Sequence, residues 1–431
     1  MKDSIKSTLK FLVLATLVSC SSMVEKLTEE VVPLKPSVQK KSYCSVDDSP
    51  VTLLGRDKTG VDVFNNFLAK ASYLNKTEKM VAWSLFQMNM RPDLATPSAR
   101  FQVLTNTKSG VQYWDFKDSA LDMDLPKSSP PMTFLYGLET ILKTYSSRHS
   151  LRTISNMLDT HLPLKIPISA DFAEFIDQNK AKLLEDKVFL KSFFKAAEQL
   201  RYGESIPKLA FTKIINNYYR FKNRISVEVT TSNQMYSIDL PSLKKGEEEV
   251  LCNVDIQKYS QSKYEISEDN RERHHPYAIK YKDGQFFLGV TSISNRNFRP
   301  MMNSFLMETT QDKTSVPLCY KNSTAGISAY LSFRGRDPGQ YLYNMFQYNI
   351  HQSTDPMDLD QFIRYPRHLI LLSPLRVLYE SSRGTEEDLD KFVEQNIPIY
   401  HSQKLGEVWV YSPKSGFVID DRGKAHLSCI K

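Results

Sequence analysis

The sequence predicts an α+β protein of more than one domain, in which an all-helical N-terminal domain precedes a mixed α/β domain. Apolar residues from Val61 to Leu74 recur at three- and four-residue steps, which places them on one face of a helix. After Arg220 the pattern changes to the two-residue alternation that is typical of strands. We therefore expect a helical domain at 51–222 and a mixed domain at 223–431, the latter with antiparallel hairpins and a C-terminal strand–helix–strand unit.

Several further helices are expected in the first domain. Thr77 can cap a helix that Pro92 interrupts, and Thr96 with Pro97 offers the start of another. The residues from Val111 to Phe116 predict one isolated strand. Helical patterns continue at 132–145, 151–158, 171–200 and 205–219.

The second domain carries the clearest strand signals. Tyr277–Lys282 and Gln285–Thr291 flank Asp283-Gly284, a pair that is typical of a two-residue hairpin turn. Closer to the C-terminus, His368–Ser373 and Ile397–Tyr400 are apolar runs separated by a helical segment, which predicts two parallel strands. Strands at 408–411, 417–419 and 425–430 are expected to extend that sheet.

Length and composition exclude a disordered chain. The 431 residues are 41% hydrophobic and 11% aromatic, which is enough for real cores. No apolar run after Cys20 approaches the roughly 18 residues that a membrane-spanning helix needs. The net charge of +7 is spread along the chain, as on an ordinary solvated surface, although it also suits an anionic envelope partner. We expect no nucleic-acid partner, no cofactor and no metal site.

The first twenty residues have the layout of an export signal, with lysines ahead of an apolar run that ends in Leu17-Val18-Ser19-Cys20. That ending resembles the lipobox of bacterial lipoproteins. The resemblance implies removal of residues 1–19, lipidation of Cys20 and a polar tether at 20–50. Ser21 in the next position implies the outer membrane. The alternative is an ordinary signal peptide in which the cysteine is incidental.

Four cysteines remain in an exported chain, where the environment allows disulfides. Cys252 and Cys319 both lie in strand-like runs of the second domain, so we favour a bond between them. That choice leaves Cys44 and Cys429, whose bond would join the start of the folded body to its end. Four buried free thiols are the alternative.

Complete catalytic motifs are missing, since the chain has no Gly-x-Ser-x-Gly, no His-Glu-x-x-His and no phosphate-binding loop. His274 and His275, followed by Asp283, resemble in part the His-x-Lys…Asp…Gly signature of phospholipase D-like phosphodiesterases. The resemblance implies a histidine nucleophile, but Pro276 stands in the lysine position, which implies a degenerate, inactive relative. Alternatively, the two histidines simply enter a strand and point to opposite faces.

Arg334 and Arg336 lie on a glycine-containing turn and are candidates for binding a carboxylate or phosphate. Taken together, the sequence favours a lipid-anchored envelope protein that binds or scaffolds an envelope protein or glycan without catalysis. The alternative is an envelope hydrolase of phosphodiester, glycan or peptide bonds, with catalytic residues that converge from distant positions.

Overall fold

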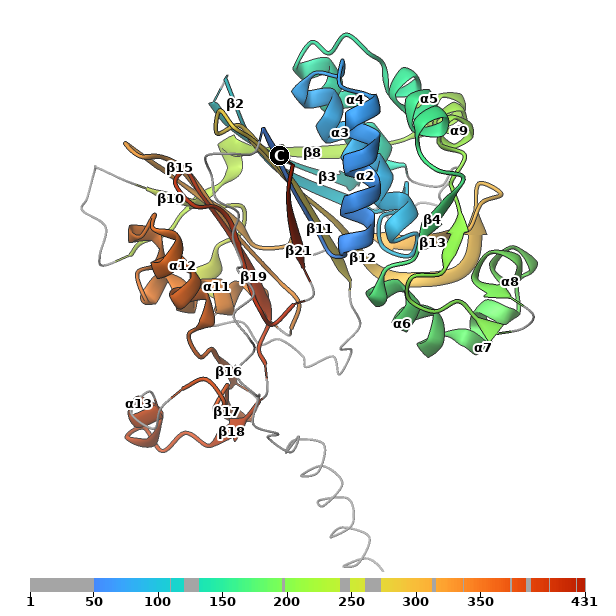
Figure 1. Cartoon of the computed structure of the whole chain (residues 1–431). Helices are drawn as coiled ribbons and strands as arrows, with labels where there is room; N and C mark the ends of the chain where they lie inside the picture. The colour runs from blue at the N-terminus through green and yellow to red at the C-terminus, as the bar shows by residue number, and fades with distance from the viewer. Residues whose placement is uncertain are drawn as a thin grey trace, which may run out of the picture.

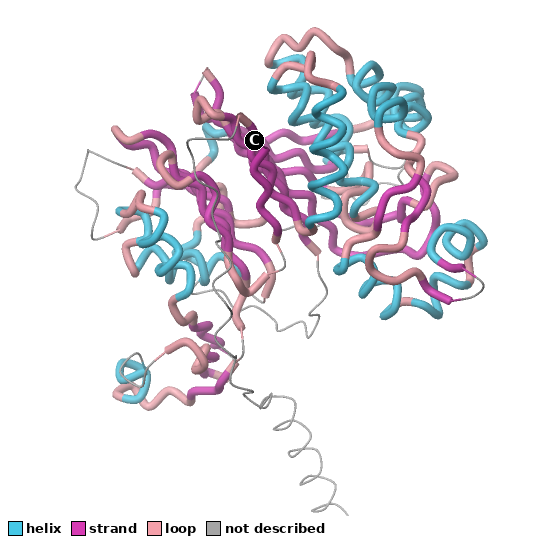
Figure 2. Tube along the Cα trace, viewed as in Figure 1, coloured by secondary structure: helices cyan, strands magenta, loops and turns pink. Residues whose placement is uncertain are grey.

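The computed structural model describes residues 50–430, apart from 109, 120–131, 196–197, 241–248, 260–272, 312–314, 336, 373, 385–388, 403 and 424. Two β-sheets are stacked face to face, and helices cover the outer face of each (Figure 1). The body is therefore a four-layer sandwich. The secondary structure alone, as coloured in Figure 2, makes the two central sheets easy to follow.

The first sheet is antiparallel and joins strands from both ends of the chain. Its strand order is β21-β1-β11-β12-β2-β3-β8, and β13 pairs with the far part of β12. The strands are β1 (Val51–Gly55), β2 (Arg100–Thr107), β3 (Gly110–Asp118), β8 (Val227–Thr231), β11 (His274–Tyr281), β12 (Phe286–Met301), β13 (Leu306–Gln311) and β21 (His426–Ile430).

The second sheet is also antiparallel and has the order β20-β19-β15-β14-β10-β9. Its strands are β9 (Tyr236–Ser237), β10 (Val250–Cys252), β14 (Leu318–Ser323), β15 (Gly326–Phe333), β19 (Glu407–Ser412) and β20 (Gly416–Ile419). Smaller sheets pair β4 (Lys165–Pro167) with β7 (Ser205–Pro207), β5 (Phe194–Lys195) with β6 (Glu198–Gln199), and β16 (His368–Leu372) with β17 (Leu375–Tyr379) and β18 (Ile399–His401).

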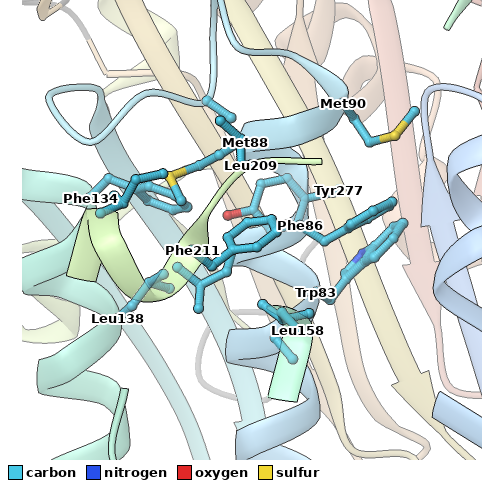
Figure 3. Packing of buried hydrophobic residues seen from close by; sticks show 14 of the residues in the cluster. Trp83, Phe86, Met88, Met90, Phe134, Leu138, Leu158, Leu209, Phe211 and Tyr277 are labelled. Carbon is cyan, nitrogen blue, oxygen red and sulfur yellow. The ribbon is translucent and has the colours of Figure 1, made fainter. Parts of the chain in front are cut away.

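Helices of the first half cover the outer face of the first sheet. They are α2 (Lys58–Lys70), α3 (Lys76–Met90), α4 (Thr133–Thr144), α5 (Leu151–His161), α6 (Ala170–Gln178), α7 (Lys180–Leu184), α8 (Lys187–Phe193) and α9 (Phe211–Phe221). The residues from Asn75 to Glu78 form a capping box that begins α3. Helix α3 is buried on nearly every side, and its Trp83 and Phe86 pack towards Tyr277 of β11 (Figure 3).

The later helices cover the second sheet. They are α10 (Ile256–Tyr259), α11 (Pro338–Gln347) and α12 (Pro356–Arg364). Helix α13 (Asp390–Val393) packs instead on the small sheet of β16, β17 and β18, through Phe392. Short 3-10 turns lie at Lys222–Arg224, Ser232–Gln234 and Ile350–Gln352. One apolar cluster lies between this sheet and α11 and α12, and another, around Leu288, Leu331 and Trp409, fills the space between the two sheets. None of the helices among the described residues combines the length and the apolar character needed to span a bilayer.

The prediction of an all-helical N-terminal domain is wrong. The range 51–222 contributes β1, β2 and β3 to the first sheet, where they pair with strands of the second half, for example Leu104 with Leu288. Thr96 and Pro97 lead into strand β2 and begin no helix. Both faces of β2 are buried over its first six residues, so it shows none of the alternation that marks a half-exposed strand.

The prediction that the strands at 368–373 and 397–400 pair directly, as a strand–helix–strand unit, is wrong. The missed strand β17 lies between β16 and β18, antiparallel to the first and parallel to the second. Strands β19 and β20 belong to the second large sheet, and β21 belongs to the first. Apolar runs specify burial but not the neighbour, and that limit explains the error.

The disulfide that the sequence favoured, Cys252–Cys319, is present and joins register partners on β10 and β14. Strand β21 pairs with β1, which places Cys429 opposite Thr52, so the start and end of the folded body are neighbours. Cys20 and Cys44, with the whole lipobox and tether, lie outside the described residues.

Candidate functional site

The hairpin of β11 and β12 determines which residues meet at the end of the sandwich. Its loop is one residue longer than the Asp-Gly pattern predicts, because Tyr281 and Gln285 close it and Gly284 takes a positive φ of 80°. The resulting register places His274 opposite Ser292. A two-residue turn would shift the strand by one residue and turn each side chain to the other face.

His274 and Ser292 are in direct contact on the face of the first sheet that meets the second sheet. The ring nitrogen Nδ1 of His274 lies 3.1 Å from Oγ of Ser292, within hydrogen-bond distance. Ser292 is fully buried and His274 is partly exposed. A serine hydroxyl in contact with an imidazole has the geometry of a nucleophile and its base.

His275 points the opposite way, into the helical layer, where its Nε2 lies 3.0 Å from Oε1 of Gln87 on α3. The two histidines therefore occupy opposite faces of β11 and cannot hold one ligand together. Only His274 contributes to the space between the sheets.

A buried arginine flanks Ser292 on its other side. Arg100 on β2 is the register partner of Ser292. Its guanidinium donates to both carboxylate oxygens of Asp115, at 2.8 and 2.5 Å, and to Oγ of Ser315, at 2.5 Å. This bidentate pair fixes the cation beside the serine hydroxyl.

Tyr113 links the two sheets next to this pair. Its hydroxyl oxygen accepts hydrogen bonds from Gln102 on β2, at 3.0 Å, and from Asn253, just after β10 of the second sheet, at 2.9 Å. Burial, reinforced by the nearby Asp115 carboxylate, raises the pKa of the Tyr113 hydroxyl well above its usual value, so the group stays neutral. The Tyr113 hydroxyl thus connects the first sheet to the second at the end of the sandwich that carries Ser292.

A second charged group lies where β1 ends and β19 begins. Arg56 donates to Glu407 on β19, at 2.7 and 2.9 Å, and to Asp171 on α6, at 2.9 Å. Arg334, one of the anion-binding candidates, has its guanidinium 3.6 Å from the same Glu407. Its charge is therefore offset by a buried carboxylate, whereas Arg336 lies outside the described residues.

The phosphodiesterase-like residues are not brought together. Asp283 lies in the hairpin loop, at the other end of β11 from His274, and forms an ion pair with Lys76. Sequence reasoning missed Ser292, Arg100 and Asp115 altogether. The hairpin register was the signal that could have found the serine. Among the described residues, no group of histidines, cysteines and carboxylates is arranged to hold a metal ion.

No family model and no curated protein matches this chain. Solved structures do match it. The crystal structure of cephalosporin acylase from Bacillus halodurans is similar over 94% of this chain and 99% of its own, with a TM-score of 0.59 and 10% identity. A structure of LmbA2991HD is similar over 91% of this chain and 100% of its own, with a TM-score of 0.61 and 9% identity. The chain therefore shares the overall fold of these two structures.

Proposed function

We propose that this chain is an acyl-transfer enzyme, a hydrolase or transpeptidase of amide bonds, with its site at the His274 end of the sandwich. The observation that carries the proposal is the contact between Ser292 and His274, which lies between the two sheets and beside a fixed arginine. The similarity to an acylase over nearly the whole chain supports the same reaction class. This choice replaces the non-catalytic role that the sequence favoured.

The roles follow from the geometry. Oγ of Ser292 attacks the amide carbonyl carbon and forms a carbon–oxygen bond, while Nδ1 of His274 takes the hydroxyl proton. The carbon–nitrogen bond then breaks, and the imidazolium gives its proton to the leaving amine. Water or a second amine attacks the acyl-serine in turn, which releases an acid or a new amide and restores Ser292.

Arg100 has a positioning and electrostatic role. Asp115 and Ser315 hold its guanidinium in place, so the positive charge beside Ser292 needs no rearrangement during the reaction. A preorganised cation stabilises the negative charge that develops on a carbonyl oxygen under attack.

The lipobox resemblance supports a further proposal, that the enzyme is held in the cell envelope by a lipid on Cys20. We propose the outer membrane as its location on the basis of Ser21. The substrate is then an amide of the envelope or of the medium. Mass spectrometry of the purified native protein tests the lipid anchor independently of activity. A chain that begins at Cys20 and carries fatty acid on that residue is expected, and an unmodified residue 20 would contradict the proposal.

The test of catalysis compares Ser292→Ala with the wild-type full-length protein on a panel of acyl p-nitroanilides and acylated cephalosporins. We expect wild-type turnover and a loss of about 10⁴-fold or more in the variant. A matched control is Ser332→Ala, since Ser332 is equally buried but lies on the far face of β15 and its hydroxyl has no hydrogen-bond partner within the described residues. Equal rates for wild type and Ser292→Ala would refute the proposed role of the serine.

A non-catalytic binding role is the second candidate, and one observation favours it. Ser292 is 0% exposed, and Arg100 beside it is already paired with Asp115. Under this alternative no covalent acyl adduct forms on Ser292 with any substrate in the panel. Intact-mass measurement after incubation with an activated acyl ester distinguishes the two roles.

A further inference from the structure

An open hollow of about 580 Å³ lies on the outer side of the first sheet, against the short helix α7. Its walls are the far part of β12 on one side and the residues around α7 on the other, near the lower right of Figure 1. The lining residues are Lys182, Glu185, Arg296, Asn297, Phe298 and Arg299. Arg296 follows Ser292 by four residues on β12, about 14 Å along a strand, so the hollow is separate from the candidate acyl-transfer site.

Positive charge exceeds negative charge in this hollow. Three of the lining side chains are cationic, and Glu185 is the single carboxylate among them. Lys182 and Arg299 are exposed and form no ion pair with any described residue. The third cation, Arg296, has a carboxylate partner in Asp93, with Nε and Oδ2 3.1 Å apart.

Aromatic rings lie beneath two of these cations, Lys182 and Arg296. Phe298 stacks on Phe175 of α6, with ring centroids 6.2 Å apart and planes inclined by 2°. The ammonium group of Lys182 lies 5.0 Å from the centroid of Phe298, and the guanidinium of Arg296 lies 4.9 Å from that of Phe175. Cations that rest on aromatic rings lose little further freedom when an anion binds.

The donor set suits carboxylates. Guanidinium forks match planar carboxylates with two parallel hydrogen bonds. The same region already shows the arrangement, since Asp93 accepts 2.9 Å hydrogen bonds from Nε and Nη2 of Arg91 while it also pairs with Arg296. The volume falls within the range of about 300–1,000 Å³ that ligand pockets occupy.

We propose that this hollow is a binding site for a short acidic peptide, whose carboxylates pair with Lys182 and Arg299. Arg296 adds a third positive charge, and Asn297 offers an amide to the peptide backbone. The site does not depend on acyl transfer at Ser292, so either proposal can fail without the other.

The test measures the fluorescence anisotropy of fluorescein-labelled hexaglutamate with the full-length protein. The double variant Lys182→Ala/Arg299→Ala is expected to raise Kd by about tenfold, because two charge-assisted hydrogen bonds are lost. Glu185→Gln is expected to lower Kd by about two- to threefold, because it removes the repelling carboxylate. A matched control is Lys187→Ala/Lys191→Ala on α8, which removes the same charge from exposed positions outside the hollow and should leave Kd within about twofold.

Three results would overturn the proposal. The first is equal weakening by the two double variants, which would mean that peptide binding follows net charge alone. The second is equal affinity for hexaglutamine. The third is displacement of hexaglutamate by inorganic phosphate at concentrations at which acetate has no effect, which would assign the hollow to phosphate.

Discussion

Replacement of Asp337 by asparagine should stabilise this protein at neutral pH. Asp337 is the N-cap of α11, and its Oδ1 accepts a 3.0 Å hydrogen bond from the backbone N–H of Gln340. The residue is only 5% exposed. Burial raises the pKa of its carboxyl group from 3.8 to about 6, against the opposing effect of its hydrogen bonds to Gln340.

The sign follows from the direction of the shift. The folded state prefers the neutral acid. The contribution of Asp337 to the free energy of unfolding is therefore fully present below pH 3.8 and is lost as the pH rises through about 6. The difference between these two pKa values corresponds to about 3 kcal/mol, at about 1.4 kcal/mol per pH unit. Asp337→Asn keeps the accepting oxygen of the cap and never ionises.

Urea unfolding of wild type and Asp337→Asn at several pH values from 4 to 8 measures this effect. The two free energies of unfolding should agree near pH 4 and diverge until the variant is up to about 3 kcal/mol more stable at pH 8. Asp355→Asn at the cap of α12 is the control, because Asp355 is exposed and favours its helix as a charged group. A difference between wild type and Asp337→Asn that does not change with pH would refute the reasoning.

Three other variants test the packing and the cross-links. Arg56→Met should lower the free energy of unfolding by about 3–5 kcal/mol, because the buried carboxylates of Asp171 and Glu407 lose their shared cation. A Tm within 2 °C of the wild-type value would contradict this. Gly137→Ala should lower the free energy of unfolding by about 1–3 kcal/mol, because a Cβ would lie 2.7–2.8 Å from phenylalanine rings beneath α4. Urea unfolding measures this, and Thr144→Ala at an exposed position of the same helix is the control that should be nearly neutral. Cys252→Ala/Cys319→Ala opens a loop of 67 residues and should lower the free energy of unfolding by about 4 kcal/mol. Dithiothreitol should therefore lower the urea midpoint of the wild type by more than it lowers that of the variant.

Local patterns were enough to find many of the helices. The stripe from Val61 to Leu74 and the capping signal before Met80 correspond to α2 and α3, since helix signals lie within a few turns of one another. The strands of the first half could not be found in the same way. Strand β2 pairs with β12 almost two hundred residues away, and no local pattern contains that neighbour.

The candidate site could not be predicted from the sequence for a different reason. His274 and the Asp283-Gly284 turn were both recognised, but the turn type was assigned as two residues, which leaves Ser292 one position out of register. Arg100 and Asp115 give no signal, because the patterns around them predict a helix start at Thr96 and an isolated strand at 111–116. The Cys252–Cys319 bond was accessible, since both cysteines lie in strand-like runs and the alternatives were few.

The pairing of β1 with both β11 and β21 has a consequence for the timing of folding. Strand β1 is synthesised long before either of its neighbours, since one begins at His274 and the other ends at Ile430. Loop closure over such separations is slow, and the sheet cannot be completed before residue 430 has left the ribosome. Until then the edges of β1 are unpaired, so chaperones that shield exposed strands should govern the yield of folded protein.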